Sequence, residues 1–293
     1  MKQAGIGALV FELPPTMSKT AVQFGPRLVG SPTGSLRSAV LVKPSPAIER
    51  TATLPGEPGV LFSRALEQHA NLCKLLEYYG VQAIAIDPHA QDGLEVAAAD
   101  AAVAFEDGAM LMRPSAMSRR AEADRMEAEF ARIDVPLAGH IAAPGLLDGA
   151  DVLLAAGTAF VGVGSRGNDL GRAGFAEVAR AHGYAVVEVP LAPGSPPLRA
   201  LAGAAGKDTI VVAAGRIDPA VFGGFRTVPV EPGEDLAAGV LPLGERRVVA
   251  DLRYRTSLRA MRKAGIAVES IDLYEFAKIG VTPSMLALAI KRD

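Results

Sequence analysis

Short apolar runs alternate with segments of helical periodicity along most of the chain. Residues 38–43 have the pattern of a buried strand, because aliphatic side chains cluster there and Pro44 ends the run. Residues 62–79 place apolar side chains on one helical face, and Gly80 follows as a C-cap. Further strands are predicted over 81–86, 101–105, 109–114, 135–137, 151–157, 159–164, 185–190, 209–214, 227–230, 247–252, 267–272 and 285–290, and further helices over 119–133, 169–182 and 256–263. The pattern predicts an α/β fold.

The order of these elements repeats along the chain. A unit of strand, strand, helix and strand recurs at a spacing of roughly 40–60 residues, which indicates repeated supersecondary units. A dinucleotide-binding doubly wound sheet would not repeat in this way. Residues 1–37, rich in Gly, Pro and Ser, are predicted to form an irregular N-terminal arm. No long polar linker divides the remainder, so residues 38–293 are predicted to form one α/β domain.

The composition of the chain argues against a nucleic-acid-binding, membrane-spanning or disulfide-rich protein. The 293 residues include 30 Lys and Arg against 32 Asp and Glu, so no basic excess favours nucleic acid or anionic lipid. No apolar stretch approaches the ~20 residues of a membrane span, and Glu12 interrupts the N-terminal apolar run where a secretory signal would continue. A single Cys excludes a disulfide framework and suits a reducing compartment. We expect a cytoplasmic protein without a nucleic-acid or membrane partner.

The single thiol, Cys73, lies four residues after His69 on the apolar face of a predicted helix. Such a pair has the residue types of a nucleophile and its base. Packing in the core is the favoured interpretation, because reactive thiols need an exposed electropositive setting. The histidines show no metal-binding spacing, and no cofactor is predicted.

Two other segments carry candidate chemistry. Arg113 ends an apolar run just before a proline, where its guanidinium could clamp a carboxylate by two parallel hydrogen bonds or pair with a structural acid. Ser118 and the Arg119-Arg120-Ala121-Glu122 run after it are typical of a helix cap. Asp148 and Asp151 flank a tight turn, where they could orient a His or hold a cation, although turn chemistry alone also explains Asp before Gly.

Several of these segments together resemble the dimethylarginine dimethylaminohydrolases. AMLMRPSAMSRRAE at 109–122 is similar to ALITRPGAPSRRxE of that family, LLDGADVL at 146–153 to L(D/E)GGDVL, and FVGVGSRGN at 160–168 to FVGLSxRTN. The C-terminal IDLYEFAKIGVTPSMLALAI resembles the last strand region, which carries the family's nucleophile. The order and spacing agree from about residue 95 to the C-terminus, with weaker agreement from residue 38.

The resemblance implies both a fold and a mechanism. The wider guanidine-modifying group, with its arginine deiminases and amidinotransferases, has a fivefold pseudosymmetric α/β propeller (pentein) of ββαβ units. In its active members a Cys thiolate attacks the guanidinium carbon, a His moves protons and a carboxylate orients the His. By position, Asp148 would orient the His, and Asp100 would bind the guanidinium, with Ala99 replacing the usual acidic neighbour. Arg113 and Arg166 would bind the amino-acid carboxylate.

Besides Ala99, two catalytic positions depart from the family's pattern. Ser284 falls at the position of the nucleophilic Cys, and Pro197 at the position of the His. No His follows His182 and no Cys follows Cys73, so a shifted alignment restores neither group. A serine hydroxyl is un-ionised near neutral pH and needs an adjacent base. Proline has no ionisable group and no N–H, so it cannot be that base.

Three functions follow as hypotheses. The first is a pseudoenzyme, or an enzyme with rewired catalysis, that keeps a pocket for an arginine-like amino acid or guanidino compound. The second is an active amidine hydrolase or amidinotransferase that recruits Ser284, Asp148 and His140. The third is a structural or interaction protein with a closed pocket. Convergence of Ser284, Asp148 and Asp100 on an open cavity would favour the first two, and homo-oligomerisation stays open.

Overall fold

The computed structural model describes residues 24–89 and 92–293. Within these residues the strands form five sheets of three strands each, ordered β15-β1-β2, β3-β4-β5, β6-β7-β8, β9-β10-β11 and β12-β13-β14. In every sheet the first pair of strands is antiparallel and the second pair is parallel. The parallel pairs need a crossover between their strands, which a helix or turn supplies.

The five repeated units are made of fifteen strands, joined by α-helices and 3-10 helices in the described part of the chain. The strands are β1 (Leu36–Val42), β2 (Gln82–Ile86), β3 (Ala102–Ala104), β4 (Ala109–Leu111), β5 (Leu137–His140), β6 (Val152–Ala155), β7 (Thr158–Val163), β8 (Ala185–Pro190), β9 (Ala202–Ala204), β10 (Thr209–Val212), β11 (Arg226–Pro229), β12 (Leu241–Gly244), β13 (Arg247–Asp251), β14 (Ala267–Ile271) and β15 (Leu288–Arg292). The α-helices are α1 (Phe62–Tyr78), α2 (Ala121–Arg132), α3 (Asp169–Ala181), α4 (Leu198–Leu201), α5 (Arg255–Lys263), α6 (Tyr274–Ala277) and α7 (Pro283–Leu286). The 3-10 helices are η1 (Pro46–Arg50), η2 (Gly93–Val96), η3 (Ala98–Asp100), η4 (Met117–Arg119), η5 (Gly149–Asp151), η6 (Pro219–Phe222) and η7 (Asp235–Ala238).

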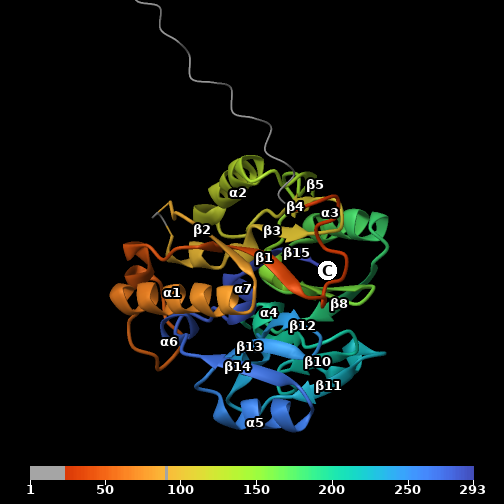
Figure 1. Ribbon diagram of the computed structural model, residues 1–293. Helices are drawn as coiled ribbons and strands as arrows, with labels where there is room; N and C mark the ends of the chain where they lie inside the picture. Colours follow the sequence, from red (N-terminus) through yellow and green to blue (C-terminus); the bar gives the residue numbers. More distant parts are fainter. Residues whose placement is uncertain (1–23, 90–91) are drawn as a thin grey trace, which may run out of the picture.

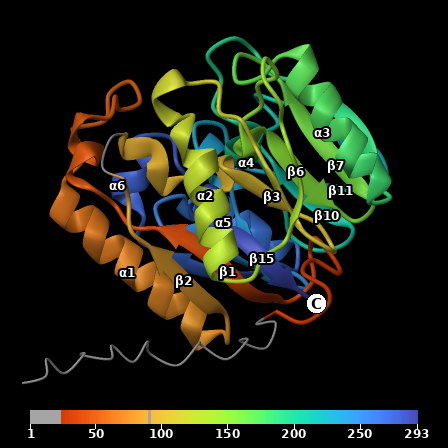
Figure 2. The same ribbon diagram turned by 90° about the horizontal axis from the view of Figure 1, so that it is seen from above.

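The five sheets follow one another around the molecule in chain order, as the colours of Figure 1 show. Helices α1, α2, α3 and α5 lie on the outside in Figure 1, and in the view from above in Figure 2 helices α1 and α3 lie at the periphery while α2 faces the viewer. The first strand of each sheet lies toward the centre, where β15 contacts β3, β6 contacts β9, and β9 contacts β12. The predicted fivefold α/β propeller is therefore confirmed.

The ring is closed by the two ends of the described chain. The C-terminal strand β15 pairs antiparallel with β1, with Ala289 opposite Ala39 and Leu288 opposite Val40. Residues 24–35 precede β1 as turns, with one isolated bridge from Val29 to Arg292. The predicted arm over 1–37 thus lies partly outside the described residues, and its described part ends at residue 35.

Apolar side chains between neighbouring sheets and their helices form the core. On α1, Leu72 and Leu76 lie on the face turned toward β1, and both are fully buried. In the fourth unit η6 replaces the long helix, because Pro219 begins a single turn that brings Phe222 onto Phe160 with ring centroids 4.9 Å apart.

Some predicted bounds were wrong. The segment 285–290 was predicted as one strand, but its first half belongs to α7 and only Leu288 onward is strand. The inner strands β9 and β12 were not predicted. The helix predicted from residue 119 begins at Ala121, and it has no side-chain N-cap because Ser118 Oγ donates to Asp92 instead, at 2.7 Å.

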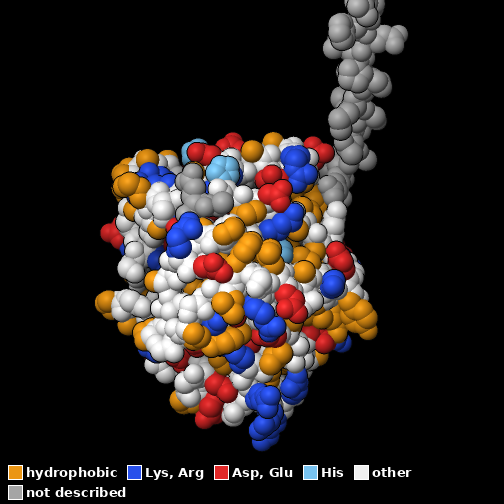
Figure 3. All heavy atoms as spheres, turned by 90° about the vertical axis from the view of Figure 1, so that its left-hand side faces the viewer, with side chains coloured by type: hydrophobic (Ala, Val, Ile, Leu, Met, Phe, Trp, Pro, Cys, Tyr) orange, Lys and Arg blue, Asp and Glu red, His pale blue; other side chains and the backbone are white. Residues whose placement is uncertain are grey.

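Charged and apolar side chains are interspersed on the face shown in Figure 3. Lys and Arg side chains gather at its lower end, where α5 lies with the sequence RTSLRAMRK. Over the two described stretches of the chain, no helix combines the length and hydropathy needed to cross a bilayer.

Candidate functional site

Five short helical turns, one before each inner strand, meet at one end of the propeller's central channel. They are η3, η5, α4, η7 and α7. Contacts join η3 to η5 and α7, and α4 to η5, η7 and α7. Asp100 ends η3, Asp148 precedes η5, Pro197 precedes α4 and Ser284 lies in α7. The fold therefore brings together four predicted site residues that are far apart in the sequence.

Asp100 is buried and fully engaged by the protein itself. Its Oδ1 accepts a 2.9 Å hydrogen bond from the Ala150 N–H, and its Oδ2 accepts one of 2.7 Å from Nη1 of Arg119. Arg119 is 4% exposed and also binds both carboxylate oxygens of Glu122, at 2.7 and 2.8 Å. The carboxylate expected to hold a substrate guanidinium thus holds one that belongs to the chain.

Arg119 is the site residue that sequence reasoning missed. It was predicted to belong to a helix cap, whereas its guanidinium is the buried partner of an acid 19 positions earlier in the chain. Burial of both charges makes the pair costly to break, because either group alone would be left desolvated and unpaired. The only sequence signal was the position of Arg119 three residues before Glu122, which is also typical of a surface helix pair.

Asp148 and Asp151 supply two further buried carboxyl groups. Asp148 Oδ1 accepts a 2.6 Å hydrogen bond from the Ser115 N–H, while burial and the charge of Asp100 raise the pKa of Asp148 to about 6. Asp151 is fully buried, and burial raises its pKa to about 7. Both groups therefore exchange protons close to neutral pH, as general acids and bases must.

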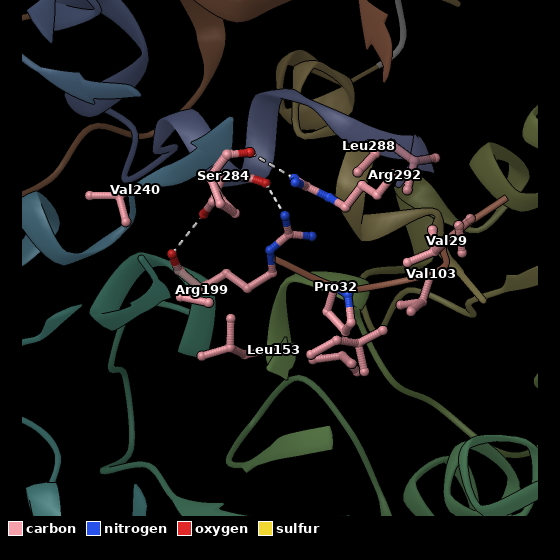
Figure 4. A pocket seen from close by; sticks show the side chains of 16 residues that line it. Val29, Pro32, Val103, Leu153, Arg199, Val240, Ser284, Leu288 and Arg292 are labelled. Atoms are coloured by element: carbon pink, nitrogen blue, oxygen red, sulfur yellow. Dashed lines mark hydrogen bonds between the residues drawn. The ribbon is translucent and has the colours of Figure 1, made fainter. Parts of the chain in front are cut away.

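Ser284 lies where a nucleophile was predicted, but its hydroxyl has no base. Its Oγ donates to the carbonyl oxygen of Arg199 at 2.9 Å (Figure 4), and it lies 3.2 Å from Oγ1 of Thr282. The side chain is 3% exposed. Pro197 is buried at the N-cap of α4, where its carbonyl accepts from the Ala200 N–H at 2.9 Å. This arrangement orients the hydroxyl without activating it.

The histidines and the thiol lie outside this group of turns. Sγ of Cys73 is 3.8 Å from Nδ1 of His69 inside α1, where burial raises the pKa of Cys73 to about 11 and lowers that of His69 to about 4. As predicted, the pair packs against the core, with His69 buried and Cys73 partly buried. His140 was placed in a loop near Asp148, but it is the exposed last residue of β5. No three His, Cys, Asp or Glu side chains of the described chain are grouped to hold a metal.

Arg113 and Arg166 flank the segment that carries Asp148. The Leu147 N–H donates to the carbonyl of Arg113 at 3.0 Å, and the Asp148 N–H donates to that of Arg166 at 3.1 Å. Both side chains are partly buried, and each donates to a backbone carbonyl, Arg113 to Gly145 and Arg166 to Ser195. Neither has a carboxylate within ion-pair distance in the described chain, so both keep donors for an acidic ligand group.

The fold and these turns define the class: the chain has the fold of the guanidine-modifying α/β propellers. The sequence matches no family model and shows no significant similarity to a curated protein. Among solved structures, it is similar to dimethylarginine dimethylaminohydrolase from Pseudomonas aeruginosa, a cysteine-to-serine variant in complex with citrulline, with 20% identity and a TM-score of 0.79. The match covers 87% of this chain and 99% of that one.

Two further structures extend the comparison. A dimethylarginine dimethylaminohydrolase histidine-to-glycine variant, an adduct with S-methyl-L-thiocitrulline, has 20% identity and a TM-score of 0.79 over 86% of this chain and 99% of that one. The N-terminal domain of ArgZ, a cyanobacterial arginine dihydrolase, has 17% identity and a TM-score of 0.72 as a cysteine-to-serine variant bound to substrate. That match covers 87% of this chain and 98% of the other. The chain thus has the fold of these two kinds of arginine-related enzyme.

Proposed function

We propose that this protein binds an arginine-like amino acid but does not hydrolyse it through a covalent thiol intermediate. The observation that carries the proposal is that serine at position 284 occurs together with proline at position 197. The Ser284 hydroxyl donates to a backbone carbonyl, and the turn expected to supply its base begins with a proline. The nucleophile and its base act as one unit, so the loss of either removes most of the rate of a covalent enzyme.

Binding is supported by the two arginines beside Asp148. Arg113 and Arg166 have no carboxylate partner in the described chain, and their guanidinium groups match the two oxygens of an amino-acid carboxylate. Asp148 supplies the acidic end that a cationic side chain needs. In the Pseudomonas aeruginosa protein, a variant with serine in place of a cysteine is complexed with citrulline, so ligand binding there does not require that cysteine.

A second candidate is an interaction protein whose pocket is closed. The observation that favours it is the ion pair between Arg119 and Asp100, since the protein's own guanidinium takes the place of a substrate's. Asp100 and Asp148 are only 3% and 5% exposed. Binding at this site would then require Arg119 to leave Asp100, or the ligand's cationic end to use Asp148 alone.

One pair of assays separates these functions from an active enzyme. Release of citrulline is measured with L-arginine and N-methylated arginines, and binding of L-arginine, the methylarginines and citrulline is measured by calorimetry. We expect binding without turnover, and a loss of about tenfold in affinity for Arg166→Met, which corresponds to about 1.4 kcal/mol. Arg259→Met, which changes an exposed arginine of α5, is the matched control and should bind as the unmodified protein does.

Two results would contradict the proposal. Citrulline release that Ser284→Ala abolishes would show an active serine-dependent hydrolase. Absence of saturable binding up to millimolar ligand would show the closed pocket. Binding that survives Ser284→Ala, with no product formed by either protein, is the result we expect.

A further inference from the structure

The central channel holds a cavity on the inner side of the five turns. The inner strands β3, β6, β9, β12 and β15 all contribute to its wall, together with residues just before β1. Its volume open to the centres of water-sized molecules is about 80 Å³. Because one water needs about 10–15 Å³ by this measure, the cavity has room for a group of roughly five heavy atoms. Of the predicted site residues, Ser284 lines this cavity, whereas Asp100 and Asp148 do not, so the three side chains do not converge on one open cavity.

Two arginines supply the charge of this cavity. Arg199 enters it from α4 and Arg292 from β15, and Figure 4 shows both guanidinium groups close to Ser284. Arg292 is 4% exposed, and burial together with the charge of Arg199 lowers its pKa to about 9. Burial lowers the pKa of Arg199 to about 10. The two cations therefore repel each other in a poorly solvated space.

Neither arginine has a carboxylate within ion-pair distance in the described chain, although the negative charge of Asp100 partly offsets the effect of burial on the pKa of Arg199. Arg292 donates only to the carbonyls of Gly34 and Pro242, each at 2.9 Å, and Arg199 donates to the carbonyl of Ser284. The Asp293 carboxylate beside them pairs with Arg37 at 2.5 Å instead. A guanidinium has five N–H donors, so most donors of both groups have no protein acceptor. Buried charges in proteins are paired, because an unpaired one is costly to desolvate.

We infer that the channel binds a small oxyanion between Arg199 and Arg292. Two guanidinium groups facing one space can each donate two parallel hydrogen bonds to a carboxylate or phosphate. The remaining wall is mostly apolar, with Val103, Leu153 and Leu288 among its side chains. The anion is therefore small, either inorganic phosphate or the carboxylate of a short aliphatic acid. This site lies on the inner side of the turns, since Arg199 belongs to α4 and Ser284 to α7, and its ligand is not the amino acid proposed above.

Thermal unfolding at constant ionic strength tests this site. Inorganic phosphate and butyrate are titrated separately into the full chain, with chloride as the compensating salt. We expect a saturable rise in Tm of about 3 °C at ten times the Kd, since binding to the native state alone stabilises it. Saturation separates site binding from the general stabilisation by phosphate, which does not saturate at low concentration. The anion whose effect on Tm saturates at the lower concentration shows whether the site prefers a phosphate or a carboxylate.

Variants of Arg292 make the test specific. Arg292→Met should abolish the saturable rise, and Arg259→Met, on the exposed face of α5, should keep it. If the Met variant does not fold, Arg292→Lys provides the test, because it keeps the positive charge. It should lower the affinity for the anion at least fivefold, because an ammonium group lacks the planar pair of donors of a guanidinium. The absence of saturation with both anions, or equal affinity in the Lys variant and the unmodified protein, would overturn the inference.

Discussion

The buried carboxyl of Asp151 makes folding stability depend on pH in the direction opposite to that of a salt-bridged carboxylate. Burial raises its pKa from 3.8 to about 7. Its Oδ1 accepts a 2.8 Å hydrogen bond from the Leu198 N–H, whereas Oδ2 has no partner. The folded protein thus holds this proton more tightly than the unfolded chain does. The resulting stability is complete below pH 3.8 and is lost as the pH rises through about 7.

The magnitude follows from the two pKa values. Each pKa unit corresponds to about 1.36 kcal/mol, so full ionisation of Asp151 lowers the free energy of unfolding by about 4 kcal/mol. Asp151→Asn keeps the acceptor for the Leu198 N–H and cannot ionise. Its amide places an N–H₂ where Oδ2 now lies, and an unsatisfied donor there costs about 1–3 kcal/mol. We therefore expect a net gain of about 1–3 kcal/mol at pH 8 and no gain at pH 4.

Urea unfolding at pH 4, 6 and 8 measures this difference. The midpoint of Asp151→Asn relative to the unmodified protein should move upward with pH, with the larger part of the change between pH 4 and 6 and the rest complete soon above pH 7. Asp124→Asn, at an exposed position of α2, is the matched control and should stay within about 0.5 kcal/mol at all three values. An equal effect of Asp151→Asn at pH 4 and pH 8 would refute the assignment of a neutral buried carboxyl.

Two further changes test the packing of the turns and the state of the thiol. Gly149→Ala should destabilise the protein by about 2 kcal/mol or more in urea unfolding, because a Cβ there would lie 2.1 Å from a backbone oxygen of η3. Gly174→Ala is the control on α3, where a Cβ meets open space, and it should stabilise the protein by about 0.5–1 kcal/mol. Cys73 of the folded protein should react with a thiol reagent at pH 8 much more slowly than the same thiol does in urea, because burial raises its pKa to about 11; equal rates would contradict this.

The sequence predicts the outer part of the propeller better than its centre. The long helices and the middle and outer strands carry clear apolar periodicity, and the structure has them within a few residues. The inner strand β9 has the sequence Ala-Gly-Ala, which lacks any preference for a strand. Gly203 is required there because a Cβ would lie 2.5 Å from the carbonyl of Ala238 in the next unit. Crowding at the channel therefore selects small residues, and these carry no periodic signal.

The sequence also predicts some residues of the candidate site and not others. Motif resemblance located Asp100, Asp148 and Ser284 on turns that the structure brings together. It did not reveal that Arg119 pairs with Asp100, because helix spacing describes only contacts within one element. Arg199 lies in no motif, and its place in the channel depends on how α4 packs against η7 and α7.

The buried acids alone do not establish a ligand, because each one also holds the fold together. Asp100, Asp148 and Asp151 each accept a backbone N–H from another segment, at 2.9, 2.6 and 2.8 Å respectively. Such hydrogen bonds to carboxylates stabilise the native turns whether or not a substrate binds. A protein that had lost every activity would still need these three acids. Arg113 and Arg166 make fewer contacts with the protein, since each side chain donates one hydrogen bond to a carbonyl and forms no ion pair in the described chain, although the charge of Arg166 also acts to lower the pKa of Asp151. The case for an amino-acid ligand therefore depends on the two arginines, and they are the side chains to change first.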